Sequence, residues 1–231
     1  MSWSEPPAEP GFDAGDAVVA LRGVRFSYLA ADGPQVVFDG LSAAFRPGRL
    51  TVLTGPSGSG KSTLLRLAAG LLAPAGGRLE HGGRRVGRSA RGRRGYRRDA
   101  VAYVFQRPAD NTFHTLTLEE NVRVVARARA VTADAAAVLA PVGLAERAGA
   151  YPGELSGGEQ QRAAVALATI GARALLAADE PTAQVDAASA RAVVAALLAA
   201  RRAGVAVVVA SHDPAVVEVA DDVVDLTAGR R

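Results

Sequence analysis

Residues 55–62 read GPSGSGKS and contain Lys61, in a chain whose other basic residues are all arginine, although Lys and Arg together number 27. The run has the spacing G-x-x-x-x-G-K-[ST], in which glycines let backbone N–H groups turn inward around an anion. A lysine ammonium is a compact charge that can reach phosphate oxygens inside such a loop, whereas the planar fork of arginine is a poor substitute. The sequence therefore predicts a loop that binds nucleotide phosphates.

The segments on both sides of this loop agree with that interpretation. Residues 50–54 form a short β-branched apolar run typical of a strand, and residues 62–69 place leucines on one face of a helix. A chance match in a loop rich in glycine and serine is the alternative, and the strand–loop–helix context argues against it. We expect a bound nucleoside triphosphate, with the Ser62 hydroxyl as a ligand of Mg²⁺. The residues expected at the nucleotide are Gly55, Pro56, Ser57, Gly58, Ser59, Gly60, Lys61, Ser62 and Thr63.

Length and composition fit one soluble domain. The 231 residues are 49% hydrophobic and include no cysteine, which excludes disulfides and thiolate metal sites. No apolar run approaches the roughly 18 residues of a membrane span. Residues 1–16 carry prolines and acidic residues and lack the features of a secretory signal, so we expect a disordered tail there and one domain over 17–231.

Strand-like and helix-like segments alternate along the chain. A buried strand is expected at residues 100–105, followed from about 117 to 150 by an Ala-, Arg- and Val-rich region with helical spacing. Further strands are expected at residues 18–28, 36–45, 174–178 and 205–210, and a helix at 187–202. Alternation of this kind favours an α/β fold in which helices flank a parallel sheet.

Two acidic residues, Asp179 and Glu180, follow the apolar run of residues 175–178. The C-terminal ends of strands are where α/β sheets place their chemistry. An aspartate there can hold Mg²⁺ together with Ser62, and the adjacent glutamate can act as a general base on an attacking water. The start of a helix is the alternative, since acidic residues favour first turns. The phosphate loop upstream makes an ATPase site the better interpretation.

Residues 155–162, LSGGEQQR, resemble the LSGGQ signature of the ATP-binding-cassette (ABC) ATPases. Four other residues match landmarks of that family, and they occur along the chain in the order that the family shows. By this resemblance Tyr28 stacks on adenine and Gln106 senses Mg²⁺ and the attacking water. Asp186 matches the aspartate of the D-loop, and His212 matches the switch histidine that contacts the γ-phosphate. The resemblance covers nearly the whole chain.

The resemblance implies a P-loop NTPase of the ABC type, with a RecA-like core, an antiparallel β subdomain and a helical subdomain at about 107–164. Its cofactors would be ATP and Mg²⁺. The implied catalytic residues are Glu180, His212, Gln106 and Lys61, the implied Mg²⁺ ligands are Ser62, Gln106 and Asp179, and nucleotide contacts beyond the phosphate loop are implied for Tyr28, Ser156, Gly157, Gly158 and Asp186.

The signature has a physical basis of its own. Ser156, Gly157 and Gly158 open a helix, whose unpaired N–H groups and positive dipole end attract an anion. In the family this helix end binds the γ-phosphate held by the phosphate loop of another subunit. An ordinary capping box between Ser156 and Glu159 is the alternative, and one serine can serve both roles.

Three features depart from the usual family pattern. Residues 182–186 read TAQVD where the family more often has Ser-Ala-Leu before the aspartate. Ala177 and Ala178 make the strand before Asp179 less bulky than is common. The segment at 107–111, after Gln106, is longer than in compact members, and that segment usually faces the transmembrane partner.

Eight arginines lie between Arg84 and Arg98. Such a run could bind nucleic acid or anionic lipid headgroups. No aromatic residue other than Tyr96 is interleaved for base stacking, so we expect a solvated loop of the β-rich subdomain and no specific nucleic-acid binding. His81 and His114 lack ligand-spaced partners and are expected at the surface.

Together these features predict the ATP-hydrolysing subunit of an ABC transporter. It would lie in the cytoplasm, at the inner face of the cell membrane, and energise a separate transmembrane permease. Two subunits would form an ATP-dependent head-to-tail homodimer, or a heterodimer with a second ABC subunit. The chain looks most like the lipoprotein-releasing and macrolide-export type of ATPase. An importer of the energy-coupling type and a soluble ABC ATPase without a permease remain alternatives.

Overall fold

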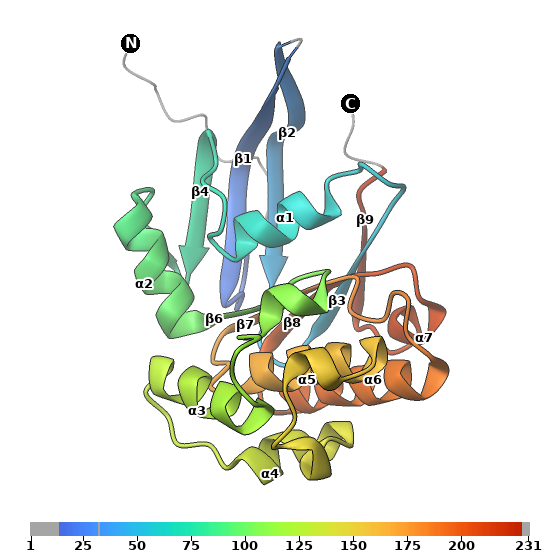
Figure 1. Ribbon diagram of the computed structural model, residues 1–231. Helices are drawn as coiled ribbons and strands as arrows, with labels where there is room; N and C mark the ends of the chain where they lie inside the picture. The colour runs from blue at the N-terminus through green and yellow to red at the C-terminus, as the bar shows by residue number, and fades with distance from the viewer. Residues whose placement is uncertain (1–13, 32, 228–231) are drawn as a thin grey trace.

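The strands form two sheets, which lie one above the other in Figure 1. The structure is a computed structural model and describes residues 14–31 and 33–227. One sheet is antiparallel, in the order β2-β1-β4-β5, and the other is parallel, in the order β6-β7-β8-β3-β9. The antiparallel strands are β1 (Val19–Ala30), β2 (Gly33–Phe45), β4 (Gly76–His81) and β5 (Arg84–Arg85). The parallel strands are β3 (Leu50–Thr54), β6 (Val101–Val104), β7 (Leu175–Asp179), β8 (Ala206–Ala210) and β9 (Asp222–Asp225). This arrangement confirms the predicted fold class.

The parallel sheet is covered on both faces. Along β7, Leu176 and Ala178 pack into a core shared with the helices below the sheet in Figure 1, while Leu175 and Ala177 pack into a core shared with the antiparallel sheet. Successive side chains of a strand point to opposite faces, so a strand buried on both sides must be apolar throughout. This requirement explains the continuous apolar runs that predicted β7 and β8, whereas β3 is apolar apart from its threonines, of which Thr51 is buried.

Helices supply the rest of both cores. The helix α1 (Lys61–Ala68) lies between the two sheets, and α6 (Ala187–Arg202), which matches its predicted bounds, packs beneath the parallel sheet against α5 (Gly157–Thr169). The region between β6 and α5 contains α3 (Leu118–Ala128), α4 (Ala135–Leu139) and short 3₁₀ helices at Pro108–Asn111, Ala140–Val142, Ala145–Arg147 and Pro152–Glu154. The helical subdomain at about 107–164 stays a prediction as a separate unit.

The two first strands are longer than the sequence predicts, because they pair to the very end of their hairpin, where Ala30 is opposite Gly33. Near the other end of the sheet, β4 approaches β1 closely. A β-carbon on Gly77 would lie 2.3 Å from the carbonyl oxygen of Gly23, so position 77 requires a glycine. The approach ties β4 to the sheet that carries Tyr28.

The expectation of a loop across the arginine-rich segment is wrong. After β5 the chain forms the helix α2 (Ala90–Ala100), with Ser89 as its N-cap accepting a hydrogen bond from Gly92 N. Arginine is a good helix former, and Tyr96 anchors the helix by donating from its hydroxyl to Ala68 O at 2.9 Å. Because α2 continues to Ala100, β6 begins one residue later than predicted.

Two short elements near the C-terminus, α7 (Pro214–Val217) and β9, do not appear among the sequence expectations. Residues 1–13 of the expected tail lie outside the described residues, whereas Asp16 accepts a hydrogen bond from Arg46 at 3.1 Å. Within the described part of the chain, no helix combines the length and apolar character that crossing a membrane requires.

Candidate functional site

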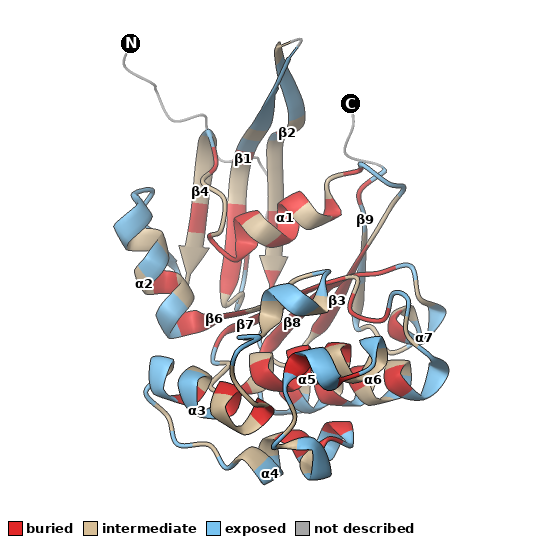
Figure 2. Ribbon diagram, in the orientation of Figure 1, coloured by how far each residue is buried: buried red, intermediate tan, exposed pale blue. Residues whose placement is uncertain are grey.

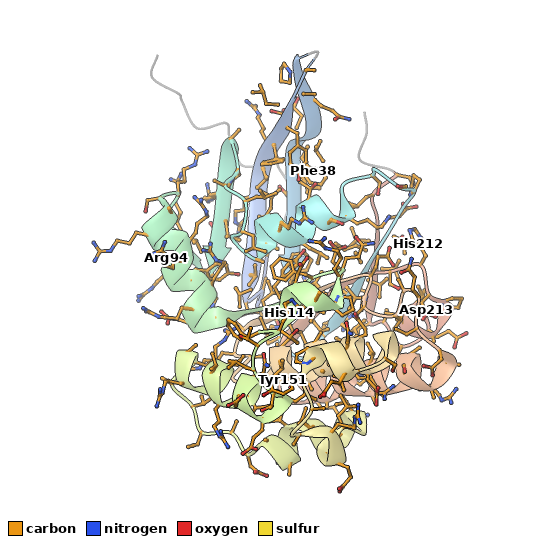
Figure 3. The ribbon with its side chains drawn as sticks, in the orientation of Figure 1. Phe38, Arg94, His114, Tyr151, His212 and Asp213 are labelled. Carbon is orange, nitrogen blue, oxygen red and sulfur yellow. The ribbon has the colours of Figure 1, made fainter. Side chains whose placement is uncertain are left out.

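The phosphate loop connects β3 to α1 with a backbone that only glycine adopts readily. Gly55, Gly58 and Gly60 have φ values of 132°, 76° and 100°, in the region that disfavours side chains. A β-carbon at Gly55 would lie 2.8 Å from Ser59 Oγ, and one at Gly60 would lie 2.8 Å from the ring of Phe38. Phe38 extends from β2 toward this end of α1 (Figure 3). The loop is therefore fitted closely to its own serine and to the antiparallel sheet.

Lys61 is the first residue of α1, and its ammonium is directed back into the loop. Its Nζ donates to Gly55 O at 2.6 Å and to Pro56 O at 3.1 Å, and the residue is only 9% exposed. Ser59 Oγ is buried and has no hydrogen-bond partner among the described residues. A cation and an unpaired hydroxyl thus lie together where the loop closes, which suits an oxygen-rich anion.

Ser62 and Asp179 are in direct contact. Ser62 Oγ donates to Asp179 Oδ1 at 2.9 Å, although the two residues are 117 positions apart. Asp179 ends β7 and is 2% exposed, so the sheet delivers a nearly buried carboxylate to the start of α1. The residues fit Mg²⁺, because this ion is typically held by one or two protein oxygens together with substrate phosphates and water. Among the described residues no cluster of three or more His, Cys, Asp or Glu offers a metal site of another kind.

Glu180 is held in a strained backbone conformation directly after Asp179. Its φ of 48° lies in the left-handed region, and its N–H donates to Ala210 O at 2.9 Å. His212 Nε2 lies 3.8 Å from Glu180 Oε1. Burial raises the pKa of Glu180 above its ordinary value, against the lowering effect of the His212 and Lys61 charges. A carboxylate with a raised pKa beside a histidine is suited to take a proton from water.

Tyr28 lies over the start of α1, although it belongs to the antiparallel sheet. Its hydroxyl shares a hydrogen bond of 3.2 Å with Thr63 Oγ1, and the edge of its ring meets Phe26 at 4.9 Å between centroids. The residue is 38% exposed. The structure thus brings Tyr28 to the phosphate-loop helix and leaves part of its ring open to a planar base.

Gln106 follows β6 and is exposed, with no hydrogen bond or ion pair to another described residue. Its position is set by Asn111, which the sequence analysis did not single out. Asn111 Oδ1 accepts from Phe105 N at 2.8 Å, and Asn111 Nδ2 donates to Phe105 O at 3.1 Å and to Arg107 O at 3.0 Å. One side chain therefore closes the loop on both sides of Gln106. An asparagine shortly after a strand is the only signal for this in the sequence.

Ser156 and Glu159 form the capping box considered above. Glu159 N donates to Ser156 Oγ at 3.3 Å, and Ser156 N donates to Glu159 Oε2 at 2.9 Å. The hydrogen bond from the Ser156 backbone lowers the pKa of Glu159. Ser156 and Gly157 are exposed, so the capped end of α5 remains accessible.

Asp186 caps α6 and connects it to α5. It accepts from Ala188 N and Ser189 N, both at 2.9 Å, and from Ser189 Oγ at 2.7 Å. The Ser189 hydroxyl in turn accepts from Arg162 of α5. Ser189 is fully buried and Arg162 lies on the signature helix, and the sequence analysis assigned a role to neither. A serine three positions after a capping aspartate is the sequence signal for this contact.

The candidate residues therefore form two groups. The first surrounds the phosphate loop and comprises Lys61, Ser62, Asp179, Glu180, His212 and Tyr28. The second comprises Ser156, Gly157, Gly158 and Asp186 at the starts of α5 and α6. No hydrogen bond or ion pair in the described part of the chain joins the two groups. This separation is what a site shared between two subunits requires.

Comparisons with known proteins agree with this geometry. A family model described as ABC transporter matches residues 38–183. The lipoprotein-releasing system ATP-binding protein LolD 1 of Rhodospirillum rubrum is 38% identical over 91% of this chain and 96% of that protein. The macrolide export ATP-binding/permease protein MacB 1/2 of Paracoccus denitrificans is 35% identical over 94% of this chain but 33% of that protein. Among solved structures, the dimeric post-hydrolysis state of the ATP-binding cassette MJ0796 bound to ADP and Pi superimposes with a TM-score of 0.81 at 26% identity, over 90% of this chain and 93% of that one.

Proposed function

The chain belongs to the ABC transporter family, whose cassettes bind and hydrolyse ATP, and from that premise we propose that it energises a separate transmembrane permease in an exporter. One observation carries the proposal: the chain combines a group of residues around the phosphate loop with an exposed, capped signature helix that shares no hydrogen bond or ion pair with them in the described part of the chain. Such a chain needs a second cassette to complete its site.

The chemistry assigned to the first group follows from its contacts. Lys61 neutralises phosphate charge inside the loop, and Tyr28 stacks on the base. Ser62 and Asp179 would hold Mg²⁺, with Gln106 completing the ligand set, and the ion supplies further neutralisation of the phosphates. Glu180 accepts the proton of the attacking water, and His212 lies beside it to contact the γ-phosphate.

The second group acts on the nucleotide of the opposite subunit. Ser156, Gly157 and Gly158 present the N-terminal end of α5, a positive dipole end with free N–H groups, to the γ-phosphate. Asp186 contacts the opposite subunit near the same place. Two copies in a head-to-tail dimer, or one copy with a second ABC subunit, would then bury two ATP molecules. The similarity to a cassette solved as a dimer with ADP and Pi supports this arrangement.

The relatives favour export. One is named as part of a lipoprotein-releasing system and the other as a macrolide exporter whose name includes a permease. The present chain covers 33% of that exporter but 96% of the lipoprotein-releasing relative, which is named as an ATP-binding protein alone, and by analogy with that relative the permease is proposed as a separate polypeptide. The subunit would then lie in the cytoplasm, bound to the inner face of the cell membrane through that permease.

Affinity purification of the full-length chain from native membranes tests this function. With Mg-ATP present, the tagged chain is expected to bring down one multi-span membrane protein in stoichiometric amount. The purified complex is then reconstituted into vesicles with the ATPase on the outside. ATP-dependent transport into these vesicles indicates export. Recovery of the chain only with ribosomes, nucleic acid or cluster-assembly proteins would place it among the soluble ABC ATPases. Uptake into intact cells in place of export would place it among the energy-coupling importers.

A further inference from the structure

Positive charge is concentrated on one side of the molecule. The whole chain has a net charge of +4, and the stretch from Arg84 to Arg98 alone contributes +8, so the rest of the chain carries −4. This stretch folds as β5 and α2, and Figure 2 shows α2 at an outer edge of the molecule with much of its surface exposed. We define the basic face as the exposed arginines of this segment, Arg84, Arg85, Arg88, Arg91, Arg94 and Arg98.

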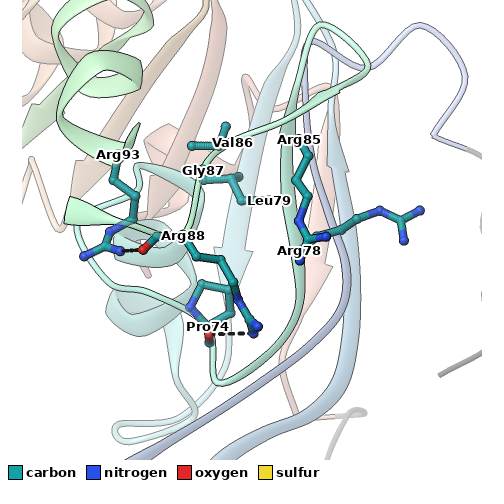
Figure 4. Close-up of a pocket in the computed structure, with 8 residues that line it drawn as sticks. All are labelled: Pro74, Arg78, Leu79, Arg85, Val86, Gly87, Arg88 and Arg93. Carbon is teal, nitrogen blue, oxygen red and sulfur yellow. Dashed lines mark hydrogen bonds between the residues drawn. The ribbon is translucent and has the colours of Figure 1, made fainter. Parts of the chain in front are cut away.

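Some arginines of the segment have a structural role. Arg88 donates to Pro74 O at 3.1 Å and to Ala75 O at 2.8 Å, and Arg93 donates to Arg88 O (Figure 4). Arg97 donates to Gly70 O at 2.7 Å, next to the C-terminal end of α1. These cations bind backbone carbonyls and hold α2 against the rest of the domain.

Other arginines have no such role. The side chains of Arg84, Arg91 and Arg94 make no hydrogen bond or ion pair to another described residue. Figure 3 shows Arg94 extending away from α2 into solvent. Since these three side chains add no hydrogen bond or ion pair within the described residues, folding does not require them to be charged.

The nearby carboxylates are already engaged. Glu80 accepts from Arg22 at 2.8 Å and from Arg78 at 2.7 Å, and Asp99 is bound by both Nε and Nη2 of Arg98. The sequence has no acidic residue between these two. Burial lowers the pKa of Arg97, and repulsion from the neighbouring charges of Arg93 and Arg94 lowers it further. An external anion would relieve that repulsion.

A small hollow lies beside the basic face. It is lined by Pro74, Arg78, Leu79, Arg85, Val86, Gly87, Arg88 and Arg93 (Figure 4). Four of these residues are arginines, and one of them, Arg78, is bound to Glu80. Arg93 Nε is buried there with no hydrogen-bond partner among the described residues. Guanidinium groups bind phosphate oxygens through paired N–H donors, so phosphate groups are the anion that the arginines of the basic face suit best.

The aromatic residue of the segment argues against single-stranded nucleic acid. Such binding combines cations with aromatic rings on which bases stack. Tyr96 is 7% exposed, its hydroxyl is bonded to Ala68 O, and its ring lies against His81 at 5.4 Å. The ring of Tyr96 is therefore not available for stacking with a base. Binding to an anionic bilayer requires only several cations on one exposed face. The helix α2 and the edge strand β5 provide such a face.

We propose that the basic face binds the phosphate groups of an anionic membrane surface, giving the chain a second attachment to the bilayer beside its permease. The choice of a membrane rests on the proposed function, which brings the chain to that surface. The interaction is electrostatic and involves no insertion. It would hold the cassette close to the bilayer while the dimer opens and closes.

The test measures co-sedimentation of the full-length chain with vesicles that contain no permease. Binding to vesicles of phosphatidylcholine with phosphatidylglycerol is expected, weakening steeply as NaCl is raised, and no binding to phosphatidylcholine alone. Replacing three cations of the basic face (Arg84→Gln, Arg91→Gln, Arg94→Gln) should weaken binding by roughly tenfold or more. The matched control replaces three exposed arginines elsewhere, Arg127→Gln, Arg191→Gln and Arg202→Gln, and should bind as the parent does.

Several results would overturn the proposal. Equal binding by the two triple variants would show that only overall charge matters, and equal sedimentation of the parent with both vesicle types would remove the anionic headgroup. Displacement by pyrophosphate well below the ionic strength at which NaCl acts would identify a free phosphate ligand instead. A tight, saturable shift with an oligonucleotide at physiological ionic strength would identify nucleic acid. Because the vesicles lack a permease, each of these results is independent of whether a permease co-purifies with the chain.

Discussion

Gly158 lies directly against Ser189: a β-carbon on Gly158 would be 2.6 Å from Ser189 Oγ and 3.0 Å from Asp186 Oδ2. The glycine opens the signature helix, and the serine and aspartate open α6. Two elements that are both proposed to face the opposite subunit are therefore fixed to each other inside one subunit. A shift of the N-terminal end of α5 must therefore move the N-terminal end of α6.

Because of this contact, a methyl group at Gly158 is expected to destabilise the folded chain. Gly158→Ala should lower the free energy of unfolding by about 1–3 kcal/mol, as overpacking of a close contact does. Urea denaturation measures the effect. Gly157→Ala is the matched control, since a β-carbon at Gly157 meets nothing within 4 Å. Adding Ser189→Gly to Gly158→Ala should restore part of the loss, and a loss of equal size in both glycine variants would contradict the contact.

Lys61→Ala should sharply weaken ATP binding and leave the fold intact. Among the described residues the ammonium is hydrogen-bonded to two loop carbonyls, so its removal takes away a charge-assisted partner of the phosphates rather than a core contact. Such a bond contributes about 1.5–3 kcal/mol, which corresponds to roughly tenfold or more in affinity. Isothermal titration calorimetry measures the change. Equal affinity in variant and parent would exclude the assigned role.

Tyr28→Ala should raise the KM for ATP more than it lowers kcat, because stacking binds the base before and during the reaction alike. The loss should be on the order of 1–3 kcal/mol, by analogy with base–aromatic stacking. Tyr28→Phe keeps the ring and removes only the hydrogen bond with Thr63, so its KM should stay close to that of the parent. A drop in kcat at constant KM would mean that Tyr28 does not stack on the base.

Glu180→Gln should keep ATP binding and lose hydrolysis by roughly 10²–10⁴-fold, as expected for the loss of a general base. The variant should accumulate as an ATP-dependent dimer, measured by light scattering with and without Mg-ATP. Adding Ser156→Arg should abolish that dimer, since a bulky cation would replace a surface that binds an anion. A Glu180→Gln protein that stays monomeric with ATP would refute the shared site.

The pKa of Glu180 also predicts a dependence on pH. Burial raises this pKa, so the base becomes protonated, and hydrolysis falls, at a higher pH than an ordinary glutamate would require. The folded state then binds a proton more readily than the unfolded state. Glu180 therefore disfavours folding above its folded pKa, and this cost vanishes as the pH falls below the unfolded pKa. Thermal unfolding should give Glu180→Gln a higher Tm than the parent at neutral pH and an equal Tm in acid. An equal Tm at both pH values would contradict the shift.

The sequence predicts the parts of this site that depend on local patterns. Strand ends and the phosphate loop are local, so Ser62 and Asp179 could be assigned from apolar runs and glycine spacing, and their contact follows from the parallel sheet. Contacts between distant segments were not predictable in the same way. Nothing in the sequence around Gly158 indicates that Ser189 fills the space where its side chain would be.

The arginine-rich segment shows a different limit. Its glycines and charges favour a loop when taken one by one, and its helix is stabilised by the Ser89 cap and by the burial of Tyr96 against α1. The second of these is a tertiary contact, which overrides local preference. The same contact removes Tyr96 from any role in stacking.

The hydrogen bonds between the Asn111 side chain and the Phe105 backbone affect which residues of this loop can change in sequence. Both ends of the short loop are held by one amide side chain, so the residues between them, 107–110, contribute little to where Gln106 lies. Substitutions there can accumulate while the position of Gln106 is inherited unchanged. The sequence of this segment can thus vary without moving Gln106, which separates what the segment contacts outside the chain from the chemistry beside it.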